Sequence, residues 1–216
     1  TPDKQRMDSL MVAANIRNLS LLELFYTCVS NLCKIMNERG TKIPDEQHHY
    51  IEKDDYNKCI YHKRDMDATE RTIVVMKDAD ILIKICDSTG DFDDTSEYQL
   101  LIRLLKEHTI IDDDCSRRLR QKEEVENPSE VLLNPSDPEA TFRYKAGGKH
   151  LGYVGNIVES VGENGSLIID YDYQPNTYAD NQFMKDYLKR KKRFFRWFLF
   201  CCRWSIQWRK KLTFSI

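Results

Sequence analysis

The sequence predicts an α+β protein in which a helical N-terminal region precedes an incomplete unit of three strands and a helix. Apolar residues recur every three or four positions in the first half of the chain, which is the helical period. Between Tyr153 and Tyr173 the period changes to two and the composition to β-branched and aromatic residues. A length of 216 residues, 41% of them hydrophobic, suits one domain or a small domain with an appendage.

Residues 1–110 are expected to be mostly helical, with three or four helices packed together. A long amphipathic helix is predicted from Met7 to about Glu38. Its apolar stripe has alternating spacings of three and four and contains Leu22, Phe25, Val29, Leu32 and Met36.

Two later helices are predicted from their N-terminal signals. Asp67 followed by Glu70 has the spacing of a reciprocal cap, and Asp94 followed by Glu97 repeats it. Gly90 and its acidic neighbours are typical of the turn between two antiparallel helices.

Residues 111–133 form a charged segment that we interpret as a linker or exposed loop. The following segment, residues 134–188, is predicted to run strand, strand, strand, helix. Its second and third strands flank an Asn-Gly turn at 162–165, which is a strong hairpin signal. The helix is predicted over Ala179–Leu188, with an apolar face of Phe183, Met184, Tyr187 and Leu188.

The last segment, residues 189–216, differs from the rest in charge. Ten of the 33 basic residues lie between Lys189 and Lys211 and no acidic residue follows Asp186, so this end carries +10 while residues 1–186 carry −12. Three interpretations are open: a basic-aromatic segment on an anionic membrane surface, a nucleic-acid-binding segment, or a sequence without a selected role. The segment is too short to span a bilayer.

One stretch combines acidic and basic residues at the start of a predicted strand. Asp137 and Glu139 are followed by Arg143, Lys145 and Lys149. Carboxylates suit Mg²⁺ or Mn²⁺, and the cations suit phosphate, so the stretch is a candidate site for a metal and an anionic substrate. Asn-Pro and Asp-Pro are also common turn starters, and a purely structural role is the alternative.

Other ligand patterns are weaker. The aspartates around Gly90 lack the spacing and the closing glutamate of a calcium loop. The five histidines have no metal-binding spacing, and the seven cysteines contain no Cys-x-x-Cys pair. Scattered cysteines and the lack of a signal peptide at the start favour a cytoplasmic protein.

Three segments together resemble the DDE-type transposases of bacterial insertion sequences. They are NPSDPEAT at 134–141, GYVGNIVE at 152–159 and DYQPNTYADNQF at 172–183. Upstream, Arg6-Met7-Asp8-Ser9 resembles the region between that family's N-terminal DNA-binding domain and its catalytic domain. The resemblance covers roughly residues 5–188.

The resemblance implies a ribonuclease-H-like domain that begins strand, strand, strand, helix, strand. It also implies metal-dependent DNA cleavage and strand transfer, in which three carboxylates from separate elements hold two Mg²⁺ ions. By analogy Asp137 is the first metal ligand and Glu139 a less suitable substitute. Asp180 matches a family acid at the start of the helix and is interpreted as a helix cap or a supporting group.

The family's second ligand is the aspartate of a motif like Ala-Asp-Gly-Ala-Tyr-Ser-Gly, which this chain lacks. Cys202–Lys210 can nevertheless be encoded so that reading one base later gives Ala-Asp-Gly-Ala-Tyr-Ser-Gly-Glu. The tail is therefore interpreted as an out-of-frame translation that begins near Lys189, and the chain as a truncated, inactive transposase.

Two alternatives come from other functional classes. The chain is either a non-catalytic DNA-binding or dimerising remnant that inhibits an intact transposase, or a membrane-surface protein that uses its tail. The expected partners are DNA at the ends of a mobile element and a second copy of the chain, with no small-molecule substrate.

Overall fold

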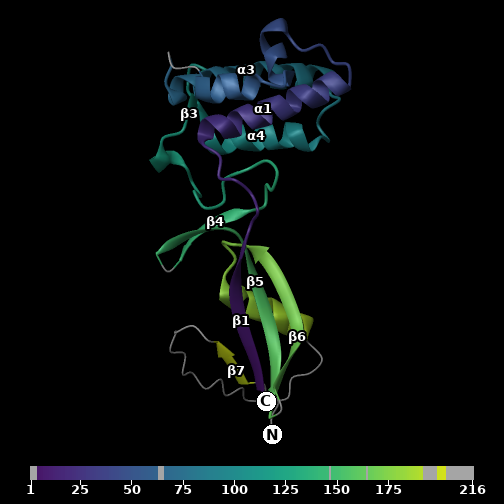
Figure 1. The fold of residues 1–216 in the computed structure, drawn as a ribbon, viewed down its shortest axis with the longest axis vertical. Helices are drawn as coiled ribbons and strands as arrows, with labels where there is room; N and C mark the ends of the chain where they lie inside the picture. The colour runs from purple at the N-terminus through teal and green to yellow at the C-terminus, as the bar shows by residue number, and fades with distance from the viewer. Residues whose placement is uncertain (1–3, 63–65, 146, 164, 192–198, 203–216) are drawn as a thin grey trace.

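The computed structural model describes residues 4–62, 66–145, 147–163, 165–191 and 199–202. The chain forms two lobes along one long axis (Figure 1). One lobe consists of helices and the other of a sheet with one helix across it, so the α+β class predicted from the sequence is confirmed.

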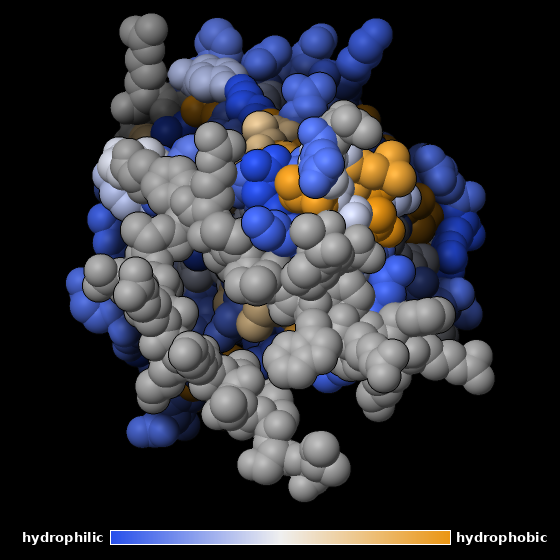
Figure 2. Space-filling model, turned by 90° about the horizontal axis from the view of Figure 1, so that it is seen from below, coloured by the Kyte–Doolittle hydropathy of each residue, from blue (hydrophilic) through white to orange (hydrophobic). Residues whose placement is uncertain are grey.

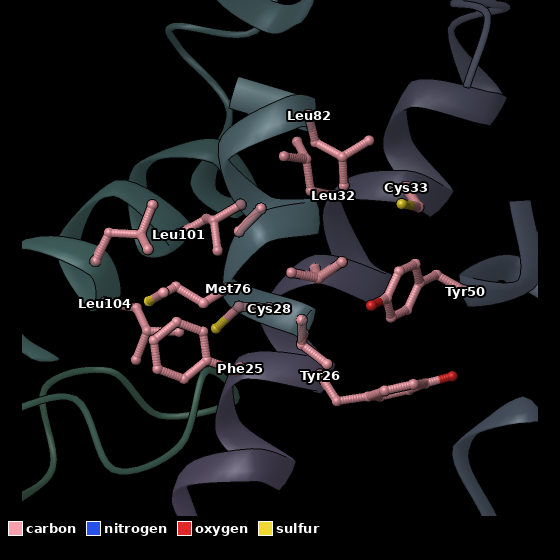
Figure 3. Close-up of a cluster of buried hydrophobic side chains, with 14 of the residues drawn as sticks. Phe25, Tyr26, Cys28, Leu32, Cys33, Tyr50, Met76, Leu82, Leu101 and Leu104 are labelled. Atoms are coloured by element: carbon pink, nitrogen blue, oxygen red, sulfur yellow. The ribbon is translucent and has the colours of Figure 1, made fainter. Parts of the chain in front are cut away.

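The helical lobe is built on three helices, α1 (Leu21–Glu38), α3 (Ala68–Thr89) and α4 (Ser96–His108). Between α1 and α3 lie the 3-10 helix η1 (Asp45–Ile51), the short helix α2 (Asp55–Asn57) and the π-helical turn η2 (Lys58–His62). The predicted apolar stripe of α1 faces the other helices and is fully buried, as Phe25 and Leu32 illustrate (Figure 3).

The helix starts follow local capping chemistry. Asp67 caps α3, and Glu70 completes the reciprocal cap, as predicted. Gly90 ends α3 with φ 70°, a conformation that glycine adopts without a steric cost. The predicted cap at Asp94 is one residue early, because α4 is preceded by Thr95 as its cap residue.

The first strand contradicts the predicted helix from Met7. Residues Lys4–Ala13 form β1, and α1 begins only at Leu21, after the cap residue Ser20. Along β1, Gln5 and Met7 are buried while their neighbours are more exposed, so the burial follows the two-residue period of a strand. The region 1–110 therefore contains a strand of the sheet.

The sheet joins distant parts of the chain. Its strands are β1, β4 (Thr141–Lys145), β5 (Gly148–Gly162), β6 (Gly165–Pro175) and β7 (Leu199–Cys202). β5 pairs antiparallel with β1 on one side and with β4 and β6 on the other, and β7 pairs parallel to β1. The predicted hairpin is confirmed as β5–β6.

Gly152 marks the corner where β5 leaves β4 and meets β1. Its φ is 134°, and a Cβ atom there would lie 2.4 Å from the carbonyl oxygen of Val12. The two backbones can approach this closely only because the residue has no side chain.

The helix α5 (Asp180–Arg190) covers one face of the sheet. Phe183 and Tyr187 are buried against Met7, Val154 and Val158, which confirms the predicted apolar face of this helix. The opposite face of the sheet carries exposed apolar side chains.

Two connectors join the lobes, residues 14–20 and the segment after α4. The second was expected to be a linker, yet it contains the hairpin β2 (Thr109–Ile111) and β3 (Arg117–Leu119) and the 3-10 turn η3 (Lys122–Glu124). Leu132 then inserts into the helical core and is 1% exposed. This segment is packed against the helical lobe.

Candidate functional site

The turn that carries Asp137 is fixed by its own backbone and by Asn134. The Asn134 carbonyl accepts a hydrogen bond from the Asp137 N–H at 3.2 Å, and the Asn134 side chain accepts one from the Ser136 N–H at 2.9 Å. The Asn134 amide also donates to the Arg17 carbonyl at 2.9 Å. The Asn-Pro start thus forms the turn that its composition indicates, and the turn touches both connectors.

The Asp137 carboxylate accepts a hydrogen bond from the Tyr153 hydroxyl on β5. Burial and this bond to a carboxylate raise the pKa of Tyr153. Glu139 lies two residues further on and is exposed. Asp137 therefore has a structural partner at the end of the sheet that faces the helical lobe.

The three basic candidates lie on β4 or at the start of β5. Arg143 donates to the Asn176 carbonyl at 3.4 Å, and the Lys149 amine lies 5.5 Å from the centre of the Phe142 ring. Lys145 is half-buried, whereas Lys149 is exposed. Arg143 and Lys149 thus contact groups of the sheet lobe itself.

Asp180 is the first residue of α5 and is exposed. The residue in the cap position is Ala179, whose side chain makes no capping hydrogen bond. Asp180 instead occupies the first turn, where a negative charge is favourable beside the unpaired N–H groups of the helix.

A carboxylate that the sequence analysis did not select lies on β1. Asp8 is half-buried and pairs in register with Ile157, on the face of the sheet that α5 leaves open. On the same face, the Arg6 guanidinium donates to the Glu159 carboxylate at 2.5 and 3.1 Å. The strand period of residues 4–13 was the signal that could have indicated this placement.

β7 ends beside Asp8. The parallel pairing places Cys202 opposite Met7, so the C-terminal end of β7 lies next to the middle of β1. Asp137 is remote from this point, because its partner Tyr153 pairs with Val12, five residues further along β1. Five residues of strand span roughly 17 Å.

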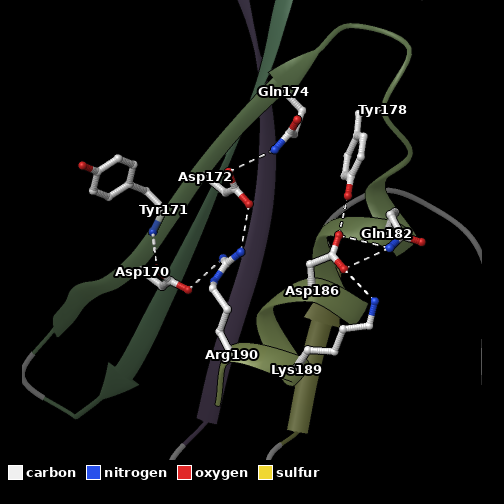
Figure 4. Close-up of polar contacts among 9 residues, drawn as sticks. All are labelled: Asp170, Tyr171, Asp172, Gln174, Tyr178, Gln182, Asp186, Lys189 and Arg190. Carbon is white, nitrogen blue, oxygen red and sulfur yellow. Dashed lines mark hydrogen bonds and ion pairs between the residues drawn. The ribbon is translucent and has the colours of Figure 1, made fainter. Parts of the chain in front are cut away.

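Three carboxylates beside the last turns of α5 are bound by neighbouring side chains (Figure 4). Arg190 donates to Asp172 at 3.0 Å and to Asp170 at 3.1 Å. Asp186 accepts hydrogen bonds from Tyr178, Gln182 and Lys189, which lower its pKa to about 2.

Within the described ranges, no three Asp, Glu, His or Cys side chains lie close enough to hold a metal ion. The resemblance implies three carboxylates that hold two metal ions, and the donors at Asp8 and at Asp137 do not supply them. The described residues therefore do not fit the metal pair that the family resemblance implies, and we derive no reaction step through it.

A groove of about 960 Å³ lies where the lobes meet. Its charged lining has both signs, with Arg103, Lys106 and Arg120 beside Glu107, Glu126 and Glu130. A track for the DNA backbone is expected to be mainly positive, so this groove is not a DNA-binding track of that kind.

Among the described residues, no helix combines the length and the apolar composition that a membrane crossing requires. Comparisons with protein-family models, with curated proteins and with solved structures each found no match for this chain.

Proposed function

We propose that this chain derives from a DDE-type transposase and contains the opening part of its ribonuclease-H-like domain. The observation that carries the proposal is the sheet order β6-β5-β1, with α5 following β6 in the chain. It corresponds to the order strand, strand, strand, helix with which the implied domain begins, whereas β7 lies in the segment interpreted as out of frame and adds no support.

This assignment makes β1 the first strand of the domain. The helical lobe is then an insertion between the first and second strands, and β4 is an addition at the edge of β5. The catalytic-domain portion begins near Lys4 and resumes at the turn of Asp137, rather than beginning at residue 134.

The same assignment favours Asp8 over Asp137 as the first metal ligand. In a chain read one base later, the aspartate of Ala-Asp-Gly-Ala-Tyr-Ser-Gly stands at position 203, one residue after Cys202. If the restored-frame strand takes the place of β7, whose Cys202 pairs with Met7, that aspartate lies beside Asp8, about 5 Å away between strands. Asp137 lies too far along the sheet to share metal ions that are about 4 Å apart.

In this chain the centre stays incomplete, since one carboxylate on β1 cannot hold two ions. We therefore propose that the chain does not cleave DNA and that any present role comes from binding or association. The membrane-surface alternative depends on residues 189–216, most of which lie outside the described residues.

The first test is the nucleotide sequence around codon 189. We expect that a one-base shift restores a long open frame that encodes an aspartate at position 203 and a further acid downstream. An absence of any open frame beyond the break would remove the transposase proposal.

The second test separates the two candidate ligands. The chain itself should not nick DNA that carries the element's ends in Mg²⁺. In the restored-frame protein, Asp8→Asn should lower the nicking rate about 100-fold or more, and Asp137→Asn less than about tenfold. The reverse ranking would return the ligand role to Asp137.

A further inference from the structure

The hairpin formed by β4 and the first residues of β5 projects sideways from the sheet, close to the connectors that join the lobes (Figure 1). Register pairs Tyr144 with Lys149 across its two strands. Directly paired residues share a face of a two-stranded hairpin, and so do residues two apart in one strand. Phe142, Tyr144 and Lys149 therefore lie on one face of the β4–β5 hairpin. Arg143 and Lys145 lie on the other.

The β4–β5 hairpin lies in a stretch of the chain without carboxylates. Residues 140–158 contain no Asp or Glu and three Lys or Arg, so their formal charge is +3 with His150 neutral. Residues 1–186 as a whole carry −12. A local excess of cations on an acidic protein favours a polyanionic partner at that place.

Two of these cations have no carboxylate partner in the described part of the chain. Arg143 bonds the Asn176 carbonyl, and the Lys149 amine lies over the Phe142 ring. Both side chains therefore keep a positive charge that no neighbouring carboxylate offsets. Most other arginines of the described chain do form ion pairs, namely Arg6, Arg17, Arg39, Arg103, Arg117, Arg118 and Arg190.

Tyr144 adds an exposed aromatic ring to this charge. The residue is 65% exposed, and its hydroxyl donates to the Gly147 carbonyl at 3.1 Å, which ties the ring to the turn of the hairpin. A ring held in this way loses little freedom when a nucleic-acid base stacks on it. Lys149, on the same face, is then placed to bind the adjoining phosphate.

The exposed tyrosine of β6 shows what the β4–β5 hairpin adds. Tyr171 is 79% exposed, but Asp170 and Asp172 flank it, and Leu167 and Ile168 toward the far end of the same strand are also exposed. Figure 2, which views the molecule from that end, shows apolar residues at the surface among hydrophilic ones. An exposed ring without cations beside it does not suit a polyanion, so Tyr171 provides a matched control.

We propose that the β4–β5 hairpin binds single-stranded nucleic acid, with a base stacked on Tyr144 and the adjoining phosphate on Lys149. Arg143 and Lys145 add to the positive potential, which extends about 8–10 Å at physiological salt. A duplex keeps its bases stacked inside the helix and offers no base face to Tyr144, so a single strand is the better fit. This binding site does not depend on the transposase origin of the chain.

The first experiment is fluorescence anisotropy of a labelled oligothymidylate of about 12 nucleotides, titrated with the full chain at about 50–200 mM NaCl. Tyr144→Ala should weaken binding about tenfold, because the stacked base is lost. Lys149→Ala should reduce the slope of log affinity against log salt by about 0.7, the value for one phosphate on a single strand.

Tyr171→Ala and Lys34→Ala are the matched controls. Both residues are exposed, on β6 and on α1 respectively, and neither change should alter the affinity or the salt dependence. Tyr144→Phe should bind like the unaltered chain, because stacking requires the ring and not the hydroxyl. Circular dichroism of each variant verifies its fold.

Photocrosslinking locates the bound strand. An oligonucleotide that contains thiothymidine should crosslink within residues 141–152, which mass spectrometry of the digested complex identifies. Crosslinks confined to residues 189–216 would overturn the proposal, because the basic tail would then be the binding segment. Full affinity of Tyr144→Ala, or equal affinity for a duplex of the same length, would also overturn it, since attraction to phosphate alone would then be sufficient.

Discussion

The two lobes differ in how completely they bury their apolar residues. The helical lobe encloses a cluster of 24 buried residues, whereas the sheet lobe encloses five, among the described residues in each case. The helical lobe encloses its stripes between α1, α3 and α4. The sheet lobe has α5 on one face and an apolar, open surface on the other.

This difference in burial implies that the two lobes need not have the same stability. A helix bundle with matched apolar faces forms a core from contacts within about ninety consecutive residues. The sheet needs β1 to reach β5 across the whole helical lobe, as the Arg6–Glu159 pair with a sequence separation of 153 shows. The sheet lobe is therefore expected to unfold first.

The largest expected effects come from truncating one buried phenylalanine in each lobe. Phe25→Ala and Phe183→Ala each remove a ring that is at most 1% exposed, which costs about 3–5 kcal/mol. Because Phe183 is one of five buried core residues in the described part of this lobe, its loss should unfold the sheet lobe alone. Phe25→Ala should instead lower the urea concentration at which the helical lobe is half unfolded.

Urea titration followed by residue-resolved hydrogen exchange measures each lobe separately. After Phe183→Ala, we expect the amides of β5 to exchange freely while those of α1 keep their protection. Equal loss of protection in both lobes would mean that the molecule unfolds as one cooperative unit, and the contrast between the lobes would not hold.

The same contrast explains what the sequence could predict. The Asp67–Glu70 cap of α3 and the hairpin at 162–165 depend on residues a few positions apart, so their local signals were sufficient. β1 depends on pairing with a strand about 150 residues away. Met7, Leu10 and Met11 also fit a helical spacing, and only the partner strand decides between the two periods.

The candidate site could not be predicted for the same reason, since it depends on long-range strand pairing. The helix predicted from Met7 placed Asp8 outside any sheet, whereas Asp137 precedes a predicted strand and matches the first acid of the family that the sequence resembles. The turn chemistry around Asp137 was predictable from Asn-Pro, whereas its hydrogen bond with Tyr153 requires the sheet to be known.

A medium effect on the free energy of unfolding is expected at Glu23, the residue that fixes the start of α1. It accepts hydrogen bonds from Ser20, Tyr56 and Tyr61 and pairs with Arg17. Although burial acts to raise it, the hydrogen bonds from Ser20 and Tyr56 and the charge of Arg17 lower the pKa of Glu23 from 4.5 to about 2.

A depressed carboxyl pKa stabilises the fold above the unfolded value near 4.5, and this stabilisation is lost as the pH falls toward 2. Glu23→Gln should therefore lower the free energy of unfolding at pH 7 by roughly 1–3 kcal/mol and flatten its pH dependence between 4.5 and 2. Urea unfolding at a series of pH values measures both.

Glu70 provides the matched control, because it occupies the same third position in the cap of α3 and its capping hydrogen bonds are exposed. Glu70→Gln should cost only about 0.5 kcal/mol. If the two variants lose the same stability, the network around Glu23 adds nothing beyond an ordinary cap.

The smallest effect is expected at Arg190, the last residue of α5, within the segment interpreted as out of frame. Its guanidinium joins Asp170 and Asp172, but the side chain is 45% exposed, and exposed ion pairs contribute about 0–1 kcal/mol. Arg190→Met should therefore cost less than about 1 kcal/mol in urea unfolding, similar to Arg6→Met, whose side chain is 42% exposed.

A much larger loss for Arg190→Met alone would mean that the sheet lobe depends on this residue. The interpreted break near Lys189 would then have to lie further along the chain, because a contact on which the fold depends is expected to belong to the original reading frame.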